Sequence, residues 1–267
     1  MAVITISRGT YTKGKEIAEK VAEKLGYNCI SREVLLEASR EFNIPEIKLE
    51  RAIHDAPSVL ERFSFGKEKY IAFIRKAILE YATKGNMVYH GLAGHFFFQD
   101  IPSVLKVRII ADMNSRVKEE MERRNISEEE ARYLLHKDDE ERRKWSLYLY
   151  GIDTWDSRLY DLVINVRWIK VDDAVDCICK FAQLPYFRST PESENRLKEA
   201  LVQAKCKVAL INDFPKAKVY VSGKKVEVIV PEARMSGERI KKKVEELLSP
   251  LSLEEVEVRV QPKVIPD

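Results

Sequence analysis

The chain has 267 residues, of which 45% are hydrophobic, and 46 Lys and Arg stand against 43 Asp and Glu. This composition supports a hydrophobic core, and the length suits one large domain or a medium and a small one. Because the net charge is only +3 and the two signs are mixed, the composition argues against a disordered chain and against nucleic-acid binding by bulk charge. No apolar run approaches the roughly 18 residues of a membrane span. The N-terminus lacks the pattern of a signal peptide, so we expect a soluble cytoplasmic protein.

The N-terminal part of the chain alternates apolar strands with amphipathic helices. Residues 2–6 predict a short buried strand, a polar turn follows at 7–14, and a helix with apolar residues every three or four positions then runs to Gly26. Further strands are predicted at 87–89, 105–111 and 159–166, and further helices at 31–42, from Pro45, at 67–83 and at 171–182. Nearly continuous apolar strands between helices are typical of a parallel sheet covered on both faces.

The remaining segments divide the chain into two parts. A long charged region at 114–145 has few apolar positions, so we expect a solvated or mobile segment there. Prolines and polar residues at 184–194 predict a boundary between a domain at 1–185 and a smaller one at 192–267. The smaller domain is expected to be an α+β unit in the order α-β-β-α-β, with a helix at 195–205, strands at 207–211 or 218–221 and at 225–230, a helix at 237–248 and a strand at 256–260.

A glycine-bearing loop between the first strand and the first helix carries the strongest functional signal. The run Gly9-Thr10-Tyr11-Thr12-Lys13-Gly14-Lys15 matches the G-x-x-x-x-G-K part of the P-loop pattern. Glycines let backbone N–H groups turn inward, the helix N-terminus adds a positive dipole end, and the lysine reaches the β- and γ-phosphates. We therefore predict that the loop from Gly9 to Glu16 binds phosphate. An ordinary strand-to-helix turn with surface lysines is the alternative.

The loop departs from the usual pattern at its end. The pattern continues with Ser or Thr, whose hydroxyl binds Mg²⁺, but Glu16 and Ile17 follow here. A metal ion would then be held through water, by the phosphates themselves, or by a hydroxyl of Ser7, Thr10 or Thr12. Phosphate binding is therefore better supported than metal binding at this loop.

Several short motifs together resemble the cytidylate kinase-like proteins. They follow one another in the same order as in that family over about residues 1–183. They are ITISR at 4–8, KEIAE at 15–19, GNMV at 85–88, VRIIA at 107–111, SEEEA at 127–131 and LYDLVIN at 159–165. The resemblance implies a P-loop kinase fold, a three-layer α/β/α domain with a parallel sheet, an acceptor-binding insertion and an arginine-bearing lid.

The resemblance also implies roles for the loop and for an acceptor side. Lys15 would stabilise charge on the transferred phosphoryl group of ATP while the loop amides hold the donor and Mg²⁺ bridges its phosphates. The family's acceptor-binding positions fall on Ser31 and Arg32. A helix N-cap followed by a surface arginine is the alternative interpretation of this pair.

The family's lid falls in the long charged region. Its D-x-x-R pattern matches Asp139 as an acceptor-binding residue and Arg142 as a catalytic one, and Arg116 matches the catalytic arginine that follows the third strand. A planar, permanently charged guanidinium suits phosphate. The alternative is that these charges form a solvated helix face, as runs of charge usually do.

A second departure lies in the run HGLAGH at 90–95. Family members usually place an arginine after the first glycine, where it helps to hold the acceptor, but Leu92 stands there. His90 and His95 could supply a donor instead, or they could be packed side chains. Together with Ile17, this departure favours an acceptor other than CMP, or weak transfer. Cys177 and Cys179 point to different helix faces and have no second ligand pair nearby, which argues against zinc.

The C-terminal part resembles a BON-like module, on the basis of its element order, its VYVSGKKV hairpin at 219–226 and its last valine-rich strand. Such modules are credited with binding phospholipid or acting as sensors. Positive and negative residues are nearly balanced there, which does not indicate a membrane surface or nucleic acid. We therefore expect an interaction or regulatory domain whose partner is an unidentified ligand or protein.

The leading interpretation is an ATP-dependent nucleoside monophosphate kinase that transfers the γ-phosphoryl group to a CMP-like acceptor. The alternative is a catalytically weak or inactive P-loop nucleotide sensor that signals through its C-terminal domain. The departures at Ile17 and Leu92 favour the sensor, whereas the P-loop lysine and the lid residues favour the enzyme. Nucleic-acid binding has little support, because no basic stripe with interleaved aromatic residues is present.

Overall fold

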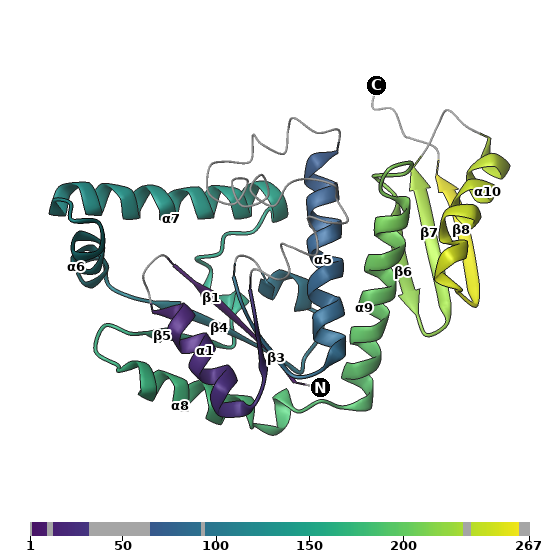
Figure 1. Cartoon of the computed structure of the whole chain (residues 1–267). Helices are drawn as coiled ribbons and strands as arrows, with labels where there is room; N and C mark the ends of the chain where they lie inside the picture. The colour runs from purple at the N-terminus through teal and green to yellow at the C-terminus, as the bar shows by residue number, and fades with distance from the viewer. Residues whose placement is uncertain (1, 10–12, 32–64, 92–93, 232–235, 262–267) are drawn as a thin grey trace.

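Two β-sheets organise the computed structural model, which describes residues 2–9, 13–31, 65–91, 94–231 and 236–261 (Figure 1). The larger sheet has five parallel strands in the order β2-β3-β1-β4-β5. These strands are β1 (Val3–Arg8), β2 (Asn28–Ile30), β3 (Met87–His90), β4 (Val104–Ile110) and β5 (Leu162–Asn165). The helices around the sheet are α1 (Gly14–Leu25), α5 (Gly66–Lys84), α6 (Met113–Arg124), α7 (Glu128–Tyr150) and α8 (Val171–Ala182), with short 3₁₀ turns η1 (Gly94–Phe98), η2 (Ser157–Leu159) and η3 (Pro185–Phe187).

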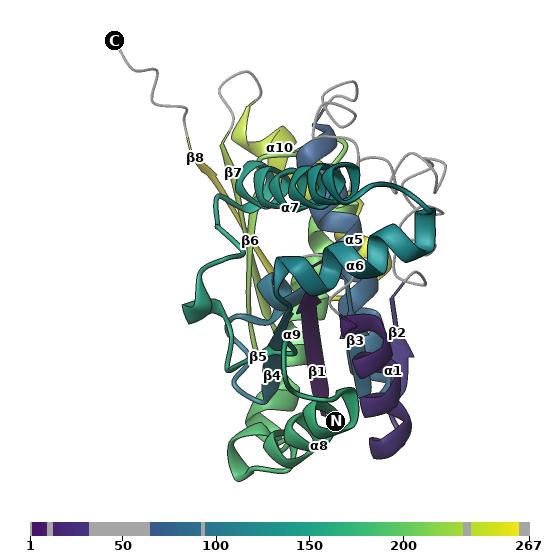
Figure 2. The ribbon, with the colours of Figure 1, turned by 90° about the vertical axis from the view of Figure 1, so that its left-hand side faces the viewer.

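Different helices cover the two faces of the larger sheet. Ile4 and Ile6 of β1 pack in the layer formed by α1 and α8, whereas Val3 packs in the opposite layer with α5 and the end of α7. Successive side chains of a strand point to opposite faces, so the unbroken apolar run of β1 serves both layers. Figure 1 shows α1 and α8 on one side of the strands and α5 on the other, and Figure 2 shows α7 beyond the arrowhead of β1. The predicted three-layer α/β/α architecture with a parallel sheet is therefore confirmed.

Local signals placed the first helix well. Its buried face consists of Ile17, Ala18, Val21 and Ala22, and Gly26 caps its end with φ of 66°. That left-handed conformation is one that glycine adopts without strain. The strand β2 was not predicted, because three residues are too few for a hydrophobic period and only pairing with β3 defines it. The predicted helices at 31–42 and from Pro45 lie outside the described residues, apart from residue 31.

The charged region between β4 and β5 forms two helices, α6 and α7. The side chain of Asp112 caps α6 by accepting from Ser115 N at 3.2 Å, and Ser127 caps α7 by accepting from Glu130 N at 3.2 Å. The expectation of a solvated segment was wrong at the end of α7, where Trp145 is only 2% exposed. A few large apolar residues suffice to anchor a long polar helix, since each buries a large area.

The C-terminal sheet has three strands in the order β6-β7-β8, with β6 antiparallel and β8 parallel to β7. Its elements are α9 (Pro191–Leu210), β6 (Lys218–Ser222), β7 (Lys225–Pro231), α10 (Gly237–Leu248), η4 (Ser249–Leu251) and β8 (Glu255–Gln261). The predicted α-β-β-α-β order is confirmed. The alternative strand at 207–211 was wrong, because α9 continues through this segment and buries Cys206 and Leu210 against the small sheet.

The helix α9 joins the two parts of the molecule, as Figure 1 shows between α5 and β6. Its residues Leu197, Ala204 and Ile211 pack in the same hydrophobic cluster as α5, while Cys206 and Leu210 pack on the small sheet. The division into domains at 1–185 and 192–267 stays a prediction. No described helix has the length and hydrophobicity that would let it cross a membrane.

Candidate functional site

The loop after β1 lies where the order of strands in the larger sheet reverses. The neighbours of β1 are β3 on one side and β4 on the other. The connection after β1 leads to β2 on the β3 side, whereas the connection after β3 leads across to β4. In open α/β sheets, ligands bind in the crevice that forms at the carboxyl ends of the strands at such a point. The predicted phosphate loop therefore occupies the position where this fold binds ligands.

The described part of the loop leads directly into the N-terminus of α1. Lys13 has φ of 56° and ψ of 10°, a left-handed conformation, and α1 begins at the next residue. Its side chain does not cap the helix, so first-turn N–H groups and the helix dipole remain oriented toward the loop. Thr10, Tyr11 and Thr12 lie outside the described residues.

Gly14 allows a close contact between the start of α1 and the end of β1. A Cβ atom at this position would lie 2.6 Å from the Cβ of Arg8 and 2.8 Å from its Cδ. Such distances are far shorter than a van der Waals contact, and an atom next to the backbone cannot move away easily. The second glycine of the motif is therefore required for packing against Arg8.

Lys15 and Glu16 project from the first turn of α1 into solvent. The Lys15 side chain is 65% exposed, and its Nζ lies 3.7 Å from Oε1 of Glu19. Glu16 Oε1 lies 3.3 Å from Nζ of Lys20. Exposed ion pairs one helical turn apart contribute little to stability. The Lys15 ammonium can therefore leave Glu19 at little cost and reach a phosphate.

The position where the usual pattern has a hydroxyl belongs to the core. Ile17 is fully buried between α1 and the sheet. Ser7 is 7% exposed, and its hydroxyl forms a hydrogen bond of 3.3 Å with the hydroxyl of Tyr160. Among the described residues, no group of three or more His, Cys, Asp or Glu side chains is placed to hold a metal ion. Any Mg²⁺ at this loop would depend mainly on oxygen ligands from phosphate, as Mg²⁺ sites in kinases commonly do.

Arg8, the last residue of β1, is a site residue for which the sequence predicted no role. Its Nε is buried, and no described residue accepts a hydrogen bond from it. Burial lowers the pKa of Arg8, and repulsion from the nearby Arg142 of α7 lowers it further. Two guanidinium groups close together at a partly buried place favour an anion between or beside them. The only sequence signal was the third letter of the ISR motif.

Arg116 and Asp139, predicted as separate site residues, bind each other. The two Nη atoms of Arg116 donate to the two carboxylate oxygens of Asp139 at 2.7 and 2.9 Å, and Arg116 is 6% exposed. This bidentate pair links α6 to α7. A phosphate could bind these Arg116 donors only by displacing Asp139, so the roles of both residues in catalysis and acceptor binding stay predictions.

The acceptor side is described in part. Ser31 follows the end of β2 and is half-buried, while Arg32 and Leu92 lie outside the described residues. His90 and His95 are buried, at 4% and 2% exposure, which agrees with the packed interpretation. Burial lowers the pKa of His95 to about 3, and Arg108 and Lys106 add repulsion. His95 is therefore neutral at physiological pH and cannot serve there as a cationic donor.

A polar network lies on the sheet face below α7. The Tyr160 hydroxyl donates to the Thr154 carbonyl at 3.0 Å, and Arg108 Nη1 donates to both that carbonyl and the Tyr160 oxygen. The Arg108 guanidinium lies 5.4 Å from the centre of the Tyr160 ring. These contacts connect Ser7 of β1 to the segment that follows α7, because the hydroxyls of Ser7 and Tyr160 also form a hydrogen bond.

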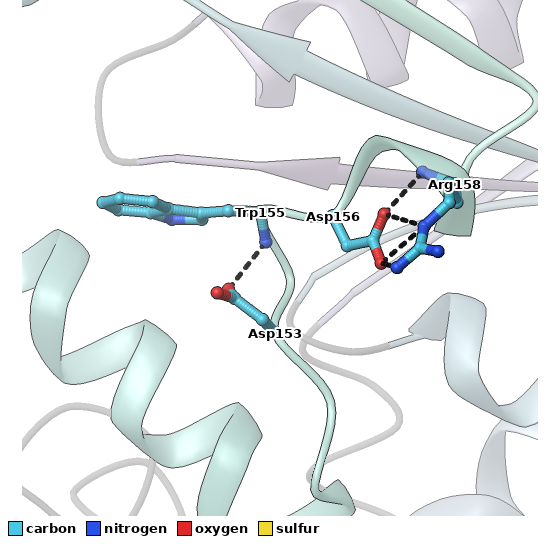
Figure 3. A network of polar contacts seen from close by, with 4 residues as sticks. All are labelled: Asp153, Trp155, Asp156 and Arg158. Atoms are coloured by element: carbon cyan, nitrogen blue, oxygen red, sulfur yellow. Dashed lines mark hydrogen bonds and ion pairs between the residues drawn. The ribbon is translucent and has the colours of Figure 1, made fainter.

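The segment between α7 and β5 is held by its own acidic residues (Figure 3). Asp153 Oδ1 accepts from Trp155 N at 3.0 Å, and Asp156 accepts from the backbone and guanidinium of Arg158. Arg143 pairs with Asp153 at 2.8 Å and lies 4.8 Å from the centre of the Trp155 ring. The guanidinium of Arg143 thus binds within this segment, whereas its neighbour Arg142 lies near Arg8.

Comparisons with known proteins agree with this geometry. The model of the cytidylate kinase-like family matches residues 3–167. Relatives include the cytidylate kinase of Sulfolobus acidocaldarius, 26% identical over 61% of this chain and 84% of the relative, and that of Pyrococcus horikoshii, 29% identical over 62% and 81%. The crystal structure of an uncharacterized protein from Eubacterium ventriosum is similar in fold, with a TM-score of 0.51 and 22% identity over 68% of this chain and 98% of that one.

The family match covers more than half of the chain and includes all five strands of the larger sheet, ending before α9 begins. It spans the phosphate loop, Arg8, the Arg116–Asp139 pair and Arg142. The order of elements, the helix N-terminus after β1 and the arginines near it are consistent with a kinase that binds nucleotides. The chain belongs to the cytidylate kinase-like family.

Proposed function

We propose that this protein is an ATP-dependent nucleoside monophosphate kinase whose acceptor is CMP or a close analogue. The γ-phosphorus of ATP would bond to a phosphate oxygen of the acceptor while its bond to the β,γ-bridging oxygen breaks, so that ADP leaves. Support for this reaction comes from family membership and from two relatives named cytidylate kinases. The observation that supports the proposal most directly is that Arg8 and Arg142 lie near each other, with Arg8 beside the helix N-terminus that follows β1.

In this proposal the chain acts by position and charge. Backbone N–H groups from Gly9 to Glu16 hold the donor phosphates, and Lys15 moves from Glu19 to the transferred group. Arg8 and Arg142 stabilise negative charge that spreads over the phosphoryl oxygens. Mg²⁺ would be held chiefly by the donor's own phosphates and would neutralise part of their charge, with Ser7 the nearest described hydroxyl of the motif.

The acceptor is proposed to bind beside Ser31 at the end of β2, together with Arg32. Asp139 and Arg116 lie between α6 and α7, where they position the helix that carries Arg142. A catalytically inactive sensor is not favoured, because the relatives are named as kinases and the arginines beside the loop are present. For residues 192–267 we propose an interaction or regulatory role of the BON-like kind, supported only by the α-β-β-α-β order.

The test is a coupled assay of ATP turnover with Mg²⁺ and CMP, dCMP, UMP, AMP or GMP as acceptor. We expect turnover with a cytidine nucleotide and a loss of at least about 100-fold in Lys15→Ala, because a charge that stabilises the transition state is removed. Lys24→Ala is the matched control, since Lys24 lies on the same helix and pairs with Asp176. Absence of turnover with every acceptor, while ATP still binds, would contradict the proposal.

A further inference from the structure

A cavity of about 620 Å³ lies where α9 meets the larger domain. Its walls come from α5, η1, the last residue of α7, and α9 with the adjoining β6. Figure 1 shows α5 and α9 running side by side at this place. Small-molecule sites have volumes of about 300–1,000 Å³ and often occur where two domains meet. None of the loop residues that the structure describes, 9 and 13–16, lines the cavity, so the cavity is separate from this part of the phosphate loop.

Arg75 of α5 supplies a partly buried positive charge in the wall of this cavity. Its Nε is buried, and no described residue accepts a hydrogen bond from it. Burial lowers the pKa of Arg75, and only the negative charge of Asp100 opposes this effect. Arginine nevertheless stays protonated in proteins. A buried guanidinium nitrogen without an acceptor is unfavourable, so the cavity favours a ligand that supplies anionic oxygen.

Tyr150 of α7 supplies a second polar group and an aromatic wall. Its hydroxyl is buried and has no hydrogen-bond partner among the described residues. Its ring centre lies 4.7 Å from that of Phe96 and 5.8 Å from that of Phe97, and all three residues line the cavity. Aromatic rings of this kind pack well against a flat ring in a ligand, by offset stacking or edge-on contact.

The other charged residues of the cavity do not neutralise Arg75. Glu199 Oε1 accepts from the backbone N–H of Gly223 at 2.6 Å, and Arg196 donates to Glu192 at 2.9 Å. Asp100 and Arg196 are exposed to solvent at the cavity's edge, where water and salt weaken their fields. Among the described residues, the cavity therefore combines a guanidinium whose Nε has no acceptor, a tyrosine whose hydroxyl has no partner, and aromatic rings.

We propose that this cavity binds a small anion that carries a flat ring, of the chemical class of nucleoside monophosphates and aryl phosphates. Arg75 binds the anionic oxygens, the Tyr150 hydroxyl makes a second hydrogen bond, and the rings of Phe96 and Tyr150 pack against the ligand's ring. Since α9 forms one wall, the bound ligand also stabilises the contact between α5 and α9. The proposal does not depend on kinase activity.

The experiment is calorimetric titration of the full chain with phenyl phosphate, which has the anion and the ring but no nucleobase. We expect Arg75→Met to weaken binding at least tenfold and Tyr150→Phe, which keeps the ring, to weaken it about fivefold. Lys76→Met is the matched control, because Lys76 is the next residue of α5, pairs with Glu80 and does not line the cavity. Lys15→Ala should bind as the unaltered protein does, since the phosphate loop is elsewhere.

Three results would overturn the proposal. One is the absence of phenyl phosphate binding, and another is binding that Lys15→Ala abolishes while Arg75→Met retains it, which would place the probe at the phosphate loop. The third is inorganic phosphate binding as tightly as phenyl phosphate, since the ring would then contribute nothing. Thermal unfolding of each variant without ligand shows whether a loss of binding reflects a loss of structure.

Discussion

At the scale of single residues, the surroundings of Arg8 indicate a role that the short ISR motif alone does not. It ends β1, contacts the start of α1 through the space that Gly14 leaves open, and lies near Arg142 of α7. A buried nitrogen without an acceptor and a neighbouring positive charge are both unfavourable in the absence of an anion. Arg8 is therefore expected to contribute more to phosphate binding than to folding.

Replacing Arg8 separates these two contributions. We expect Arg8→Met to lower kcat/KM for phosphoryl transfer by about 100-fold, because a preorganised donor is lost. The unfolding temperature of the ligand-free protein should stay the same or rise, since an unsatisfied buried charge is removed. Steady-state kinetics and thermal unfolding check the two parts, with Arg158→Met as control at a side chain that is 88% exposed. A variant that loses stability together with activity would contradict this assignment.

His95 predicts a dependence of stability on pH. Its pKa is about 3 in the folded protein and about 6.5 in an unfolded chain, so only the unfolded chain binds a proton between these values. Stability is therefore fully present above pH 6.5 and falls as the pH drops toward 3, by about 2 kcal/mol between pH 7 and pH 5 from this group alone.

Urea unfolding at pH 7 and pH 5 measures the contribution of His95. We expect His95→Leu to reduce the loss of stability between the two pH values by about 2 kcal/mol, because the leucine cannot titrate. The buried Phe97, which does not titrate, is the matched control, and Phe97→Leu should leave the difference between pH 7 and pH 5 as it is in the unaltered protein. An equal pH dependence in His95→Leu and the unaltered protein would show that other groups cause it.

At the scale of elements, the pair α6 and α7 depends on polar contacts more than on a large core. Val117, Ala131 and Leu135 form a small buried cluster between them, against which the partly buried Met113, Met121 and Ile126 pack. The bidentate pair of Arg116 with Asp139 links the same two helices. The other end of α7 is anchored in the main core by Trp145. The position of Arg142 therefore depends on an ion pair three residues before it, in the middle of α7, and on an aromatic anchor three residues after it.

Breaking the ion pair tests this dependence. We expect Asp139→Asn to lower the free energy of unfolding by about 3 kcal/mol, because the guanidinium of Arg116 stays buried without its counter-charge. Denaturant unfolding measures the change. Glu119→Gln on the exposed face of α6 is the control and should change stability by less than about 0.5 kcal/mol. A small effect in Asp139→Asn would mean that water or another acceptor replaces the carboxylate.

At the scale of the whole molecule, α9 makes the C-terminal unit part of the larger domain's packing. Leu197 and Ala204 pack with α5, and Lys207 donates to the carbonyls of Pro215 and Ala217 within its own unit. One helix thus completes two hydrophobic clusters. A shared element of this kind favours cooperative unfolding over the independent motion of a tethered domain.

A substitution in the contact between α9 and α5 should uncouple the two parts. All three tryptophans precede residue 170, so fluorescence reports the larger domain while far-ultraviolet circular dichroism reports both. We expect the two unfolding curves to coincide in the unaltered protein and to separate in Ala204→Arg, whose long charged side chain cannot fit at a position 2% exposed. Asn195→Arg, at an exposed position of the same helix, should leave the curves coincident. Separate curves in the unaltered protein would contradict a shared packing unit.

The features that local sequence patterns predicted correctly each lie within a short stretch of chain. The apolar run of β1, the loop with Gly14 and the amphipathic α1 are consecutive, and their periods and caps depend on neighbours within a few residues. The sequence also predicted the parallel sheet and the C-terminal element order for this reason. The strand alternative at 207–211 was wrong, since burial of Cys206 and Leu210 on the small sheet decides that α9 continues there. The role of Arg116 stays a prediction.

Only the tertiary structure decided which distant side chains meet. Arg8 lies near Arg142, Asp139 binds Arg116, and Arg75 shares a cavity with Tyr150, although each pair is more than 20 residues apart in the chain. Such contacts depend on how the helices cross the sheet. The sequence around a charged residue is the same whether its side chain lies in solvent, in an ion pair or beside a cavity, so the sequence pattern does not distinguish these cases. The free energy of a charged side chain differs among these three environments because burial and the available partners differ, and both arise only on folding.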